Sequence, residues 1–192
     1  HYAAPTAEDL AREQEVLDLL CERFSEWQHK GHLPKMVIEP GYNTDQPIRE
    51  RGYTHWHHLF NPRQLLTLGL FADTTERLAL SGPAAVGCLL ATGKIADWNS
   101  RLSAWLPQSG NEKGNQVFVN QALNTLANYS ARPLTKLRTP WHIDVPNCAG
   151  CHQASAAASD ARSFRAECDL YVTDPSYADA VNYHALAEFF LA

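Results

Sequence analysis

The sequence predicts an α-rich α/β chain, and two observations carry that prediction. Apolar residues recur at steps of three and four through much of residues 1–135, which is the spacing of amphipathic helices. In residues 136–192 the pattern changes, because WHIDV at 141–145 alternates and CDLYVT at 168–173 is a short apolar run, both typical of β-strands. We therefore expect a helical region over residues 1–135 and a strand-containing region over 136–192.

The first predicted helix covers residues 6–30. Thr6 followed by Asp9 resembles a capping box, and Gly31 is the kind of residue that ends a helix. Its apolar positions are Leu17, Leu20, Phe24 and Trp27. Residues 31–60 hold several prolines and the stretch GYNTDQ, so we expect an ordered loop there.

Five more helices are expected after this loop, the last at the C-terminus of the chain. Asn61 with Pro62 is a cap followed by a first-turn proline, and SGPAAV at 81–86 repeats that start signal. Apolar spacing predicts one further helix over 95–106 and another over 119–127. A C-terminal helix within ADAVNYHALAEFFLA is expected to share one face among Ala180, His184, Ala187 and Leu191.

Composition excludes several classes of protein. The chain has 192 residues, of which 45% are hydrophobic, and this excludes an intrinsically disordered or collagen-like chain. Lys and Arg number 16 against 21 Asp and Glu, so a binder of nucleic acid driven by overall basic charge is also excluded. No apolar run approaches the length of a membrane span and no signal peptide is evident, so we expect a soluble, cytoplasmic protein without a membrane partner.

The cysteines favour a reducing compartment, because their number is odd and the composition is that of a chain with an ordinary core. They are Cys21, Cys88, Cys148, Cys151 and Cys168. The chain begins without Met and stops within an amphipathic segment. We interpret it as an internal fragment of a longer protein.

The tetrapeptide DPSY at 174–177 carries the most chemistry. It follows the expected strand 168–173, and ligands bind beyond the carboxyl ends of strands in open α/β sheets. The carboxylate of Asp174 and the carbonyl of Pro175 can accept hydrogen bonds from an exocyclic amino group, while the ring of Tyr177 can stack on a base. Such a pocket suits a nucleobase that has left its stack. The alternative is a turn in which these residues only make the bend.

DPSY is similar to the Asp-Pro-Pro-Tyr motif of adenine-specific DNA methyltransferases. The surrounding YVTDPSYADAVNYHALAEFF resembles the segment around that motif in the large adenine-specific DNA methylases of prokaryotes. Three upstream stretches resemble the same family: GYNTDQPIRERGYTHWHHLFNPRQLLTLGL, DWNSRLSAW and VFVNQALNTLANYSARP. The resemblance extends from about residue 35 to the C-terminus.

The resemblance implies a Rossmann-like (class I) methyltransferase fold with a helical insertion, S-adenosylmethionine as methyl donor, and DNA as substrate. Asp174 and the carbonyl of Pro175 would hold the amino group of a flipped adenine, and Tyr177 would stack on its ring. Residues 1–135 would be the helical insertion that faces the substrate, and 136–192 part of the catalytic domain. The remainder of the methyltransferase chain would be a partner, and restriction-modification a plausible role.

Two departures from the family pattern matter. Ser176 stands where the family has proline, and serine adds a backbone donor and loosens the turn. No two of the 10 glycines are spaced as Gly-x-Gly, so the glycine-rich turn that binds the donor is missing from this chain. We expect the isolated chain to be inactive. The alternative is a non-catalytic helical module that binds DNA or a protein, with a degenerate motif.

Further candidate substrate contacts are Ser176, Arg63, Asn99 and Arg101. Asn99 and Arg101 lie in the polar stretch DWNSRLSAW, for which capping and surface solvation are an equal explanation. The run from His55 to His58 has three imidazoles around Trp56, with nearby arginines, and suits either contact with phosphate or packing. We expect no metal there.

Cys148, Cys151 and His152 form the Cys-x-x-Cys-His pattern of haem attachment, which needs an export signal that this sequence does not show. Zinc is the stronger rival, with Cys168 and either His142 or His152 completing a tetrahedral set. The favoured interpretation is free thiols in a loop and no metal.

Overall fold

The computed structural model describes seven stretches of the chain: residues 4–78, 81–106, 113–119, 122–123, 157–165, 167–175 and 183–192. The chain forms two compact units, one of His1–His142 with Asn182–Ala192 and the other of Ile143–Val181. Among the described residues, no helix is long and apolar enough to cross a membrane. Whether these units correspond to the two regions expected from the sequence stays a prediction.

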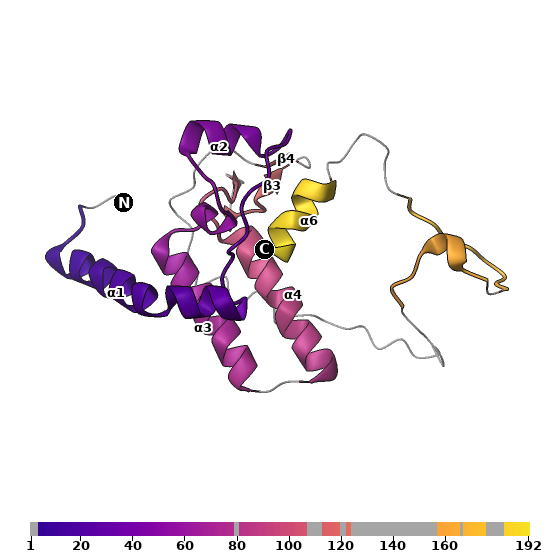
Figure 1. Cartoon of the computed structure of the whole chain (residues 1–192), viewed down its shortest axis with the longest axis horizontal. Coiled ribbons are helices and arrows are strands. Elements are labelled where there is room, and N and C mark those ends of the chain that lie inside the picture. Colours follow the sequence, from indigo (N-terminus) through magenta and orange to yellow (C-terminus); the bar gives the residue numbers. More distant parts are fainter. Residues whose placement is uncertain are drawn as a thin grey trace. The chain divides into compact units, whose positions relative to one another are not determined.

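The first unit is built mainly of helices (Figure 1). They are α1 (Ala7–Lys30), α2 (Asp45–Arg51), the 3-10 helix η1 (Trp56–Leu59), α3 (Pro62–Arg77), α4 (Gly82–Trp98) and α6 (Tyr183–Leu191). Four two-residue strands make two antiparallel pairs, β1 (Trp105–Leu106) with β2 (Lys113–Gly114) and β3 (Phe118–Val119) with β4 (Ala122–Leu123). The α-rich prediction is therefore confirmed for the described residues.

Local side-chain hydrogen bonds set the helix starts where the sequence places them. The hydroxyl of Thr6 accepts from the N–H of Asp9 at 3.2 Å, and the Asp9 carboxylate accepts from the N–H of Thr6 at 2.9 Å. Asn61 and Gln64 form the same reciprocal box at the start of α3, with both bonds 2.8 Å long. Gly31 ends α1 with a φ of 80°, a left-handed conformation that glycine adopts without strain.

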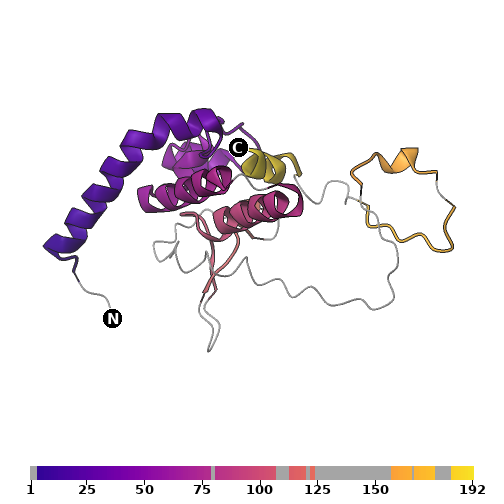
Figure 2. The ribbon, with the colours of Figure 1, turned by 90° about the horizontal axis from the view of Figure 1, so that it is seen from below.

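The core forms where α1 crosses α3. Trp27 near the end of α1 is 1% exposed, and a Cβ on Gly69 of α3 would lie 2.2 Å from the Trp27 ring. The absence of a side chain at Gly69 therefore lets the indole pack directly on the α3 backbone. The N-terminal half of α1 projects away from the rest of this unit (Figure 2), and its buried residues, Leu20 and Trp27, lie in the other half.

Helices α3 and α4 lie side by side, and the C-terminal α6 completes the core. The ring of Phe189 on α6 lies 5.6 Å from that of Trp56, 6.3 Å from that of Phe60 and 5.6 Å from that of Phe118. A residue near the C-terminus thereby joins η1, the residue that follows it, and β3. The aromatic rings stabilise this arrangement by burial and by their edge-to-face contacts.

Three predicted elements are wrong. Residues 31–60 are not all loop, since they contain α2 and η1. The helix predicted over 95–106 ends at Trp98, and Trp105 lies in β1. The described part of the helix predicted over 119–127 belongs instead to the β3–β4 pair. In the two wrongly predicted helices, strand pairing outweighs the local apolar spacing.

The strand predicted over residues 168–173 is also wrong. These residues have no regular secondary structure and are exposed, and η2 (Ala161–Ser163) is the one helical turn described in this unit. No described residue pairs with this run, so its apolar side chains have no sheet to pack in. The strand predicted over 141–145 lies outside the described residues. The Rossmann-like sheet stays a prediction.

The C-terminal helix is confirmed over Tyr183–Leu191, and the described residues of its predicted face are those turned to solvent. The buried residues of α6 are Ala185 and Phe189, whereas His184, Ala187 and Leu191 are exposed. The aromatic cluster around Phe189 selects this face, because burying that ring removes more apolar area from water than burying alanine or histidine.

Candidate functional site

The structure describes half of the DPSY motif. Asp174 and Pro175 are exposed residues in an extended segment of the second unit, while Ser176 and Tyr177 lie outside the described residues. Among the described residues, none hydrogen-bonds the Asp174 carboxylate. This carboxylate is therefore accessible to a ligand, as an acceptor of an amino group must be.

The other predicted substrate contacts lie in the first unit and have different environments. Arg63, in the first turn of α3, forms an ion pair with Glu13 of α1. Asn99 is fully buried, and its side-chain oxygen and nitrogen have no hydrogen-bond partner among the described residues. Of the alternatives left open for this residue, solvation at the surface is thereby excluded. Arg101 is half-buried, and its guanidinium lies 5.5 Å from the ring centre of Tyr53.

Asn99 belongs to a buried polar turn that ends α4. The hydroxyl of Ser103 donates to the carbonyl of Asp97 at 3.1 Å and accepts from the N–H of Ser100 at 2.9 Å. The Asp97 carboxylate accepts from the N–H of Val117 at 3.0 Å. Burial raises the pKa of Asp97, because the charged carboxylate is poorly solvated there. These side chains replace the helical hydrogen bonds and turn the chain towards β1.

A cavity of about 350 Å³ lies beside this turn, and its lining is cationic. The lining residues are Arg51, Gly52, Tyr53, His57, His58, Phe60, Pro62, Leu65 and Arg101. None of them carries a carboxylate. We call this space the histidine–arginine cavity.

The backbone around η1 holds the two histidines in place. An isolated antiparallel bridge pairs Val37 with His55, which ties the start of η1 to the loop after α1. The Nδ1 atom of His57 lies 3.1 Å from the carbonyl oxygen of Pro34, and that of His58 lies 3.1 Å from the N–H nitrogen of Thr54. The two rings are 4.5 Å apart and nearly perpendicular.

The hydrogen bond from Thr54 determines the tautomer of His58: an N–H can only donate, so Nδ1 of His58 carries no hydrogen. Nδ1 of His57 lies near both the Pro34 carbonyl and, at 3.4 Å, the side-chain nitrogen of Gln28. Neutral His58 therefore carries its hydrogen on Nε2 and can donate it to a ligand. Burial lowers the pKa of both imidazoles, and the neighbouring charges of His55 and Arg101 lower that of His58 further.

Sequence analysis singled out the histidine run and Arg101 but did not place them together. The backbone N–H of Arg101 donates to the carbonyl of Leu59 at 2.7 Å, and this bond brings the turn after α4 against η1. Tyr53 was missed as well. Its position four residues before His57, in a stretch rich in aromatic residues and arginines, was the available signal.

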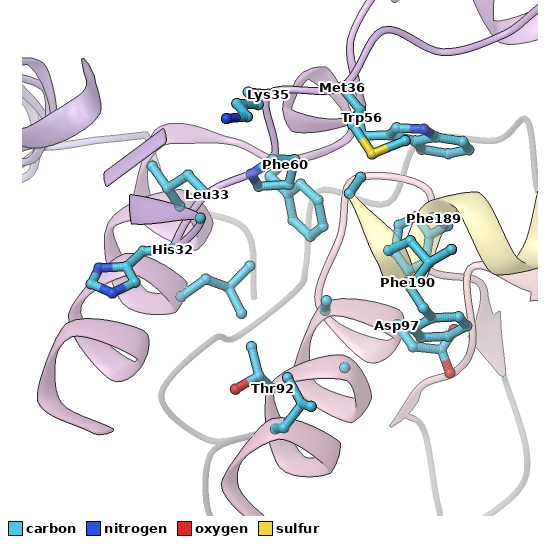
Figure 3. Close-up of a pocket in the computed structure, with 18 of the residues that line it drawn as sticks. His32, Leu33, Lys35, Met36, Trp56, Phe60, Thr92, Asp97, Phe189 and Phe190 are labelled. Atoms are coloured by element: carbon cyan, nitrogen blue, oxygen red, sulfur yellow. The ribbon is translucent and has the colours of Figure 1, made fainter. Parts of the chain in front are cut away.

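A second, larger cavity of about 830 Å³ is mainly apolar. It lies between the loop after α1, helix α4 and helix α6, with Trp56 and Phe189 among its aromatic side chains (Figure 3). Lys35 and Lys94 also line it, and the ammonium of Lys94 lies 4.2 Å from the ring centre of Trp98. The sequence did not predict this apolar cavity.

Among the described residues, one group has the composition of a metal site: His32, Asp73 and Glu76. The two carboxylates of this group already form ion pairs with neighbouring side chains. Glu76 lies 3.7 Å from the ammonium of Lys30 and 3.3 Å from Nε2 of His32, and Asp73 pairs with Arg77 at 3.2 Å. We assign no metal to it.

The proposed zinc set is described only at Cys168, an exposed free thiol. Cys148, Cys151, His142 and His152 lie outside the described residues. Cys21 is an exposed free thiol and Cys88 a buried one.

Comparison of the chain with known families, curated proteins and solved structures found no match. The functional argument therefore rests on the residues of the chain and on the geometry given above.

Proposed function

We propose that this chain is part of an adenine-specific DNA methyltransferase and that it carries the adenine pocket. The observation that carries the proposal is the sequence DPSY at 174–177 directly after an apolar run, with the Asp174 carboxylate exposed and unengaged by described residues. A carboxylate that recognises an exocyclic amine has to be accessible in this way.

The chemistry assigned to these residues is positioning. The Asp174 carboxylate and the Pro175 carbonyl accept the two hydrogens of the adenine amino group, which orients its nitrogen. The ring of Tyr177 stacks on the base and compensates for the loss of stacking when the base leaves the duplex. Holding the nitrogen in a near-attack geometry supplies much of the rate enhancement, and no covalent intermediate on the protein is required.

The implied methyl donor is S-adenosylmethionine. Because no two glycines of this chain are spaced as Gly-x-Gly, its residues do not fit the donor's glycine-rich turn. We therefore assign the donor site to the rest of the methyltransferase.

The exposed apolar run before the motif supports the same assignment. Leu170, Tyr171 and Val172 are all exposed, although their side-chain types are those of a buried strand. In the proposed enzyme the rest of the methyltransferase chain covers these side chains. The Rossmann-like sheet is part of this proposal.

The first test is a calorimetric titration of the isolated chain with S-adenosylmethionine. We expect no binding at micromolar concentration, because the donor's turn is absent. Tight binding would contradict the assignment of the donor site elsewhere.

The second test measures N6-methyladenine by mass spectrometry in DNA treated with the full-length protein. Asp174→Ala should abolish methylation, whereas the matched control Asp169→Ala, another exposed carboxylate in the same segment, should preserve it. Full methylation by Asp174→Ala, or none by the unmodified full-length protein, would refute the proposal.

Ser176→Pro tests whether serine weakens the pocket. Equal methylation rates for this variant and the unmodified protein would mean that serine is tolerated.

The alternative function is a non-catalytic helical module that binds DNA or protein. The observation that favours it is that the described core lies in the helical unit, where the residues pack without the DPSY segment. Binding of DNA by the full-length protein without any N6-methyladenine would select this alternative.

A further inference from the structure

We infer that the histidine–arginine cavity binds a phosphate group, held by Arg101 and His58. The inference goes beyond the proposed methyl transfer, because it concerns a different unit of the chain and requires neither the donor nor the DPSY motif.

The charge of the lining is the first argument. The chain as a whole has a net charge of −5, yet this cavity is lined by two arginines and two histidines and by no acidic residue. No carboxylate among the described residues forms an ion pair with Arg101. The cation is partly desolvated beside Tyr53, and an incoming anion would supply the hydrogen-bond acceptors that its guanidinium lacks.

The kinds of donor are the second argument. The guanidinium of Arg101 presents a planar fork of N–H groups that matches two oxygens of a phosphate. His58 adds a single N–H at Nε2, because its Nδ1 already accepts from Thr54. A tetrahedral anion can receive both sets of donors on different oxygens, whereas a carboxylate has two oxygens in one plane.

The size of the cavity is the third argument. A volume of about 350 Å³ is larger than one phosphate needs and leaves room for an attached sugar or base. Phe60, Pro62 and Leu65 form an apolar part of the lining that suits such an attachment. The phosphate belongs either to a nucleic-acid backbone or to a free phosphate or nucleotide, and these sources share the same recognition.

Binding can be observed directly at the histidines of the 192-residue chain. Imidazole 1H–15N NMR spectra would be recorded while inorganic phosphate is added at pH 7.5, with sodium chloride at equal ionic strength as the control. We expect the His58 Nε2 resonance to shift with a saturating dependence on phosphate and to stay in place with chloride.

Two variants test the residues. Arg101→Gln removes the fork but keeps the backbone bond to Leu59, and His58→Asn removes Nε2 while its amide oxygen can still accept from Thr54. Each should raise the dissociation constant by at least about tenfold, because one charge-assisted hydrogen bond contributes about that much and Arg101 supplies two. The control Arg12→Gln changes an exposed arginine on α1 that lies outside the cavity and pairs with Glu8, and it should bind as the unmodified chain does.

The source of the phosphate is decided by fluorescence anisotropy with a labelled DNA duplex. If DNA is the ligand, Arg101→Gln should weaken binding and reduce the slope of log K against log salt concentration by about 1. Binding of phosphate without this effect on DNA assigns the cavity to a free phosphate or nucleotide and leaves the methylation assays unaffected. The inference is overturned if phosphate leaves the His58 resonance in place, or if Arg101→Gln and His58→Asn bind phosphate as tightly as Arg12→Gln.

Discussion

The helical unit and the segment 167–175 have similar apolar residues but opposite environments. Trp27 and Trp56 in the helical unit are 1% and 0% exposed, whereas Leu170 and Val172 are 77% and 87% exposed. The difference teaches that apolar composition alone does not create an element of structure. An apolar residue stabilises a fold only when residues elsewhere in the chain remove it from water.

Hydrogen bonding differs between the two regions as well. In the helical unit, side chains bond to distant backbone groups, as Asp97 does to Val117. In the other unit, the described bonds are local, such as those from Arg162 to the carboxylate of Asp160 two residues away. Exposed local ion pairs contribute little free energy, so we expect the helical unit to dominate the unfolding transition.

The largest expected effect is the difference in stability between removing a buried apolar side chain and removing an exposed one. Phe189→Ala should lower the free energy of unfolding by about 3 to 5 kcal/mol, because it leaves a cavity among three other aromatic rings. Val172→Ala should change it by less than about 0.5 kcal/mol. Phe190→Ala, at the exposed neighbour on the same helix, is the matched control. Urea denaturation followed by circular dichroism measures all three, and equal losses at Phe189 and Val172 would contradict the comparison.

The next effect is a difference in stability between alanine substitutions at two helical glycines. Gly69→Ala should cost about 1 to 3 kcal/mol, because its Cβ would overlap the Trp27 ring. Gly87→Ala in α4 meets nothing within 4 Å, so it should stabilise the chain by about 0.5 to 1 kcal/mol through helix propensity. Thermal denaturation should give melting temperatures that move in opposite directions. A higher melting temperature for Gly69→Ala would mean that α1 and α3 do not pack as described.

A smaller effect is the difference in stability between alanine substitutions at two N-cap positions. Asn61→Ala should destabilise the helical unit by about 1 kcal/mol, because the side chain of Asn61 accepts from the N–H of Gln64. Ser81 precedes α4 in the same position but makes no side-chain capping bond, so Ser81→Ala should have almost no effect. Chemical denaturation of the two variants in parallel measures both changes. A larger loss of unfolding free energy for Ser81→Ala than for Asn61→Ala would contradict this prediction.

The smallest effect is a pH dependence that arises in the helical unit. The folded state lowers the pKa of His57 and His58 below the ordinary value near 6.5, so the unfolded chain binds protons first as the pH falls. Stability from these groups is therefore complete above about pH 6.5 and decreases below it. His58→Asn should show a shallower decrease between about pH 7 and 5.5 in denaturation at constant ionic strength. An identical decrease in both proteins would contradict the lowered pKa of His58.

Some features of the fold could be predicted because they depend on neighbouring residues. The capping boxes at Thr6 and Asn61, the proline start of α4 and the glycine that ends α1 involve groups within a few positions of one another. The histidine run and Arg101 were recognised as polar candidates for the same reason. Their common cavity was not predicted, because it depends on a bond between Arg101 and Leu59, far apart in the chain.

Other predictions failed where polar side chains compete with the local apolar spacing. Ile95, Trp98, Leu102 and Trp105 have helical spacing, yet the side chains of Asp97, Ser100 and Ser103 form a buried turn that stops α4. Asn99 was a candidate either for substrate contact or for solvation at the surface, and it is fully buried. No local pattern indicates which polar residues a fold will enclose.

The sequence by itself determined where most helices begin and which side chains are candidates for chemistry, because caps and functional groups are properties of short stretches. Only the tertiary structure decided which face of α6 is buried, that the run before Asp174 has no partner strand among the described residues, and that two histidines and two arginines share one cavity. The physical reason is that burial and electrostatic environment depend on distances in space, which separation along the chain does not specify.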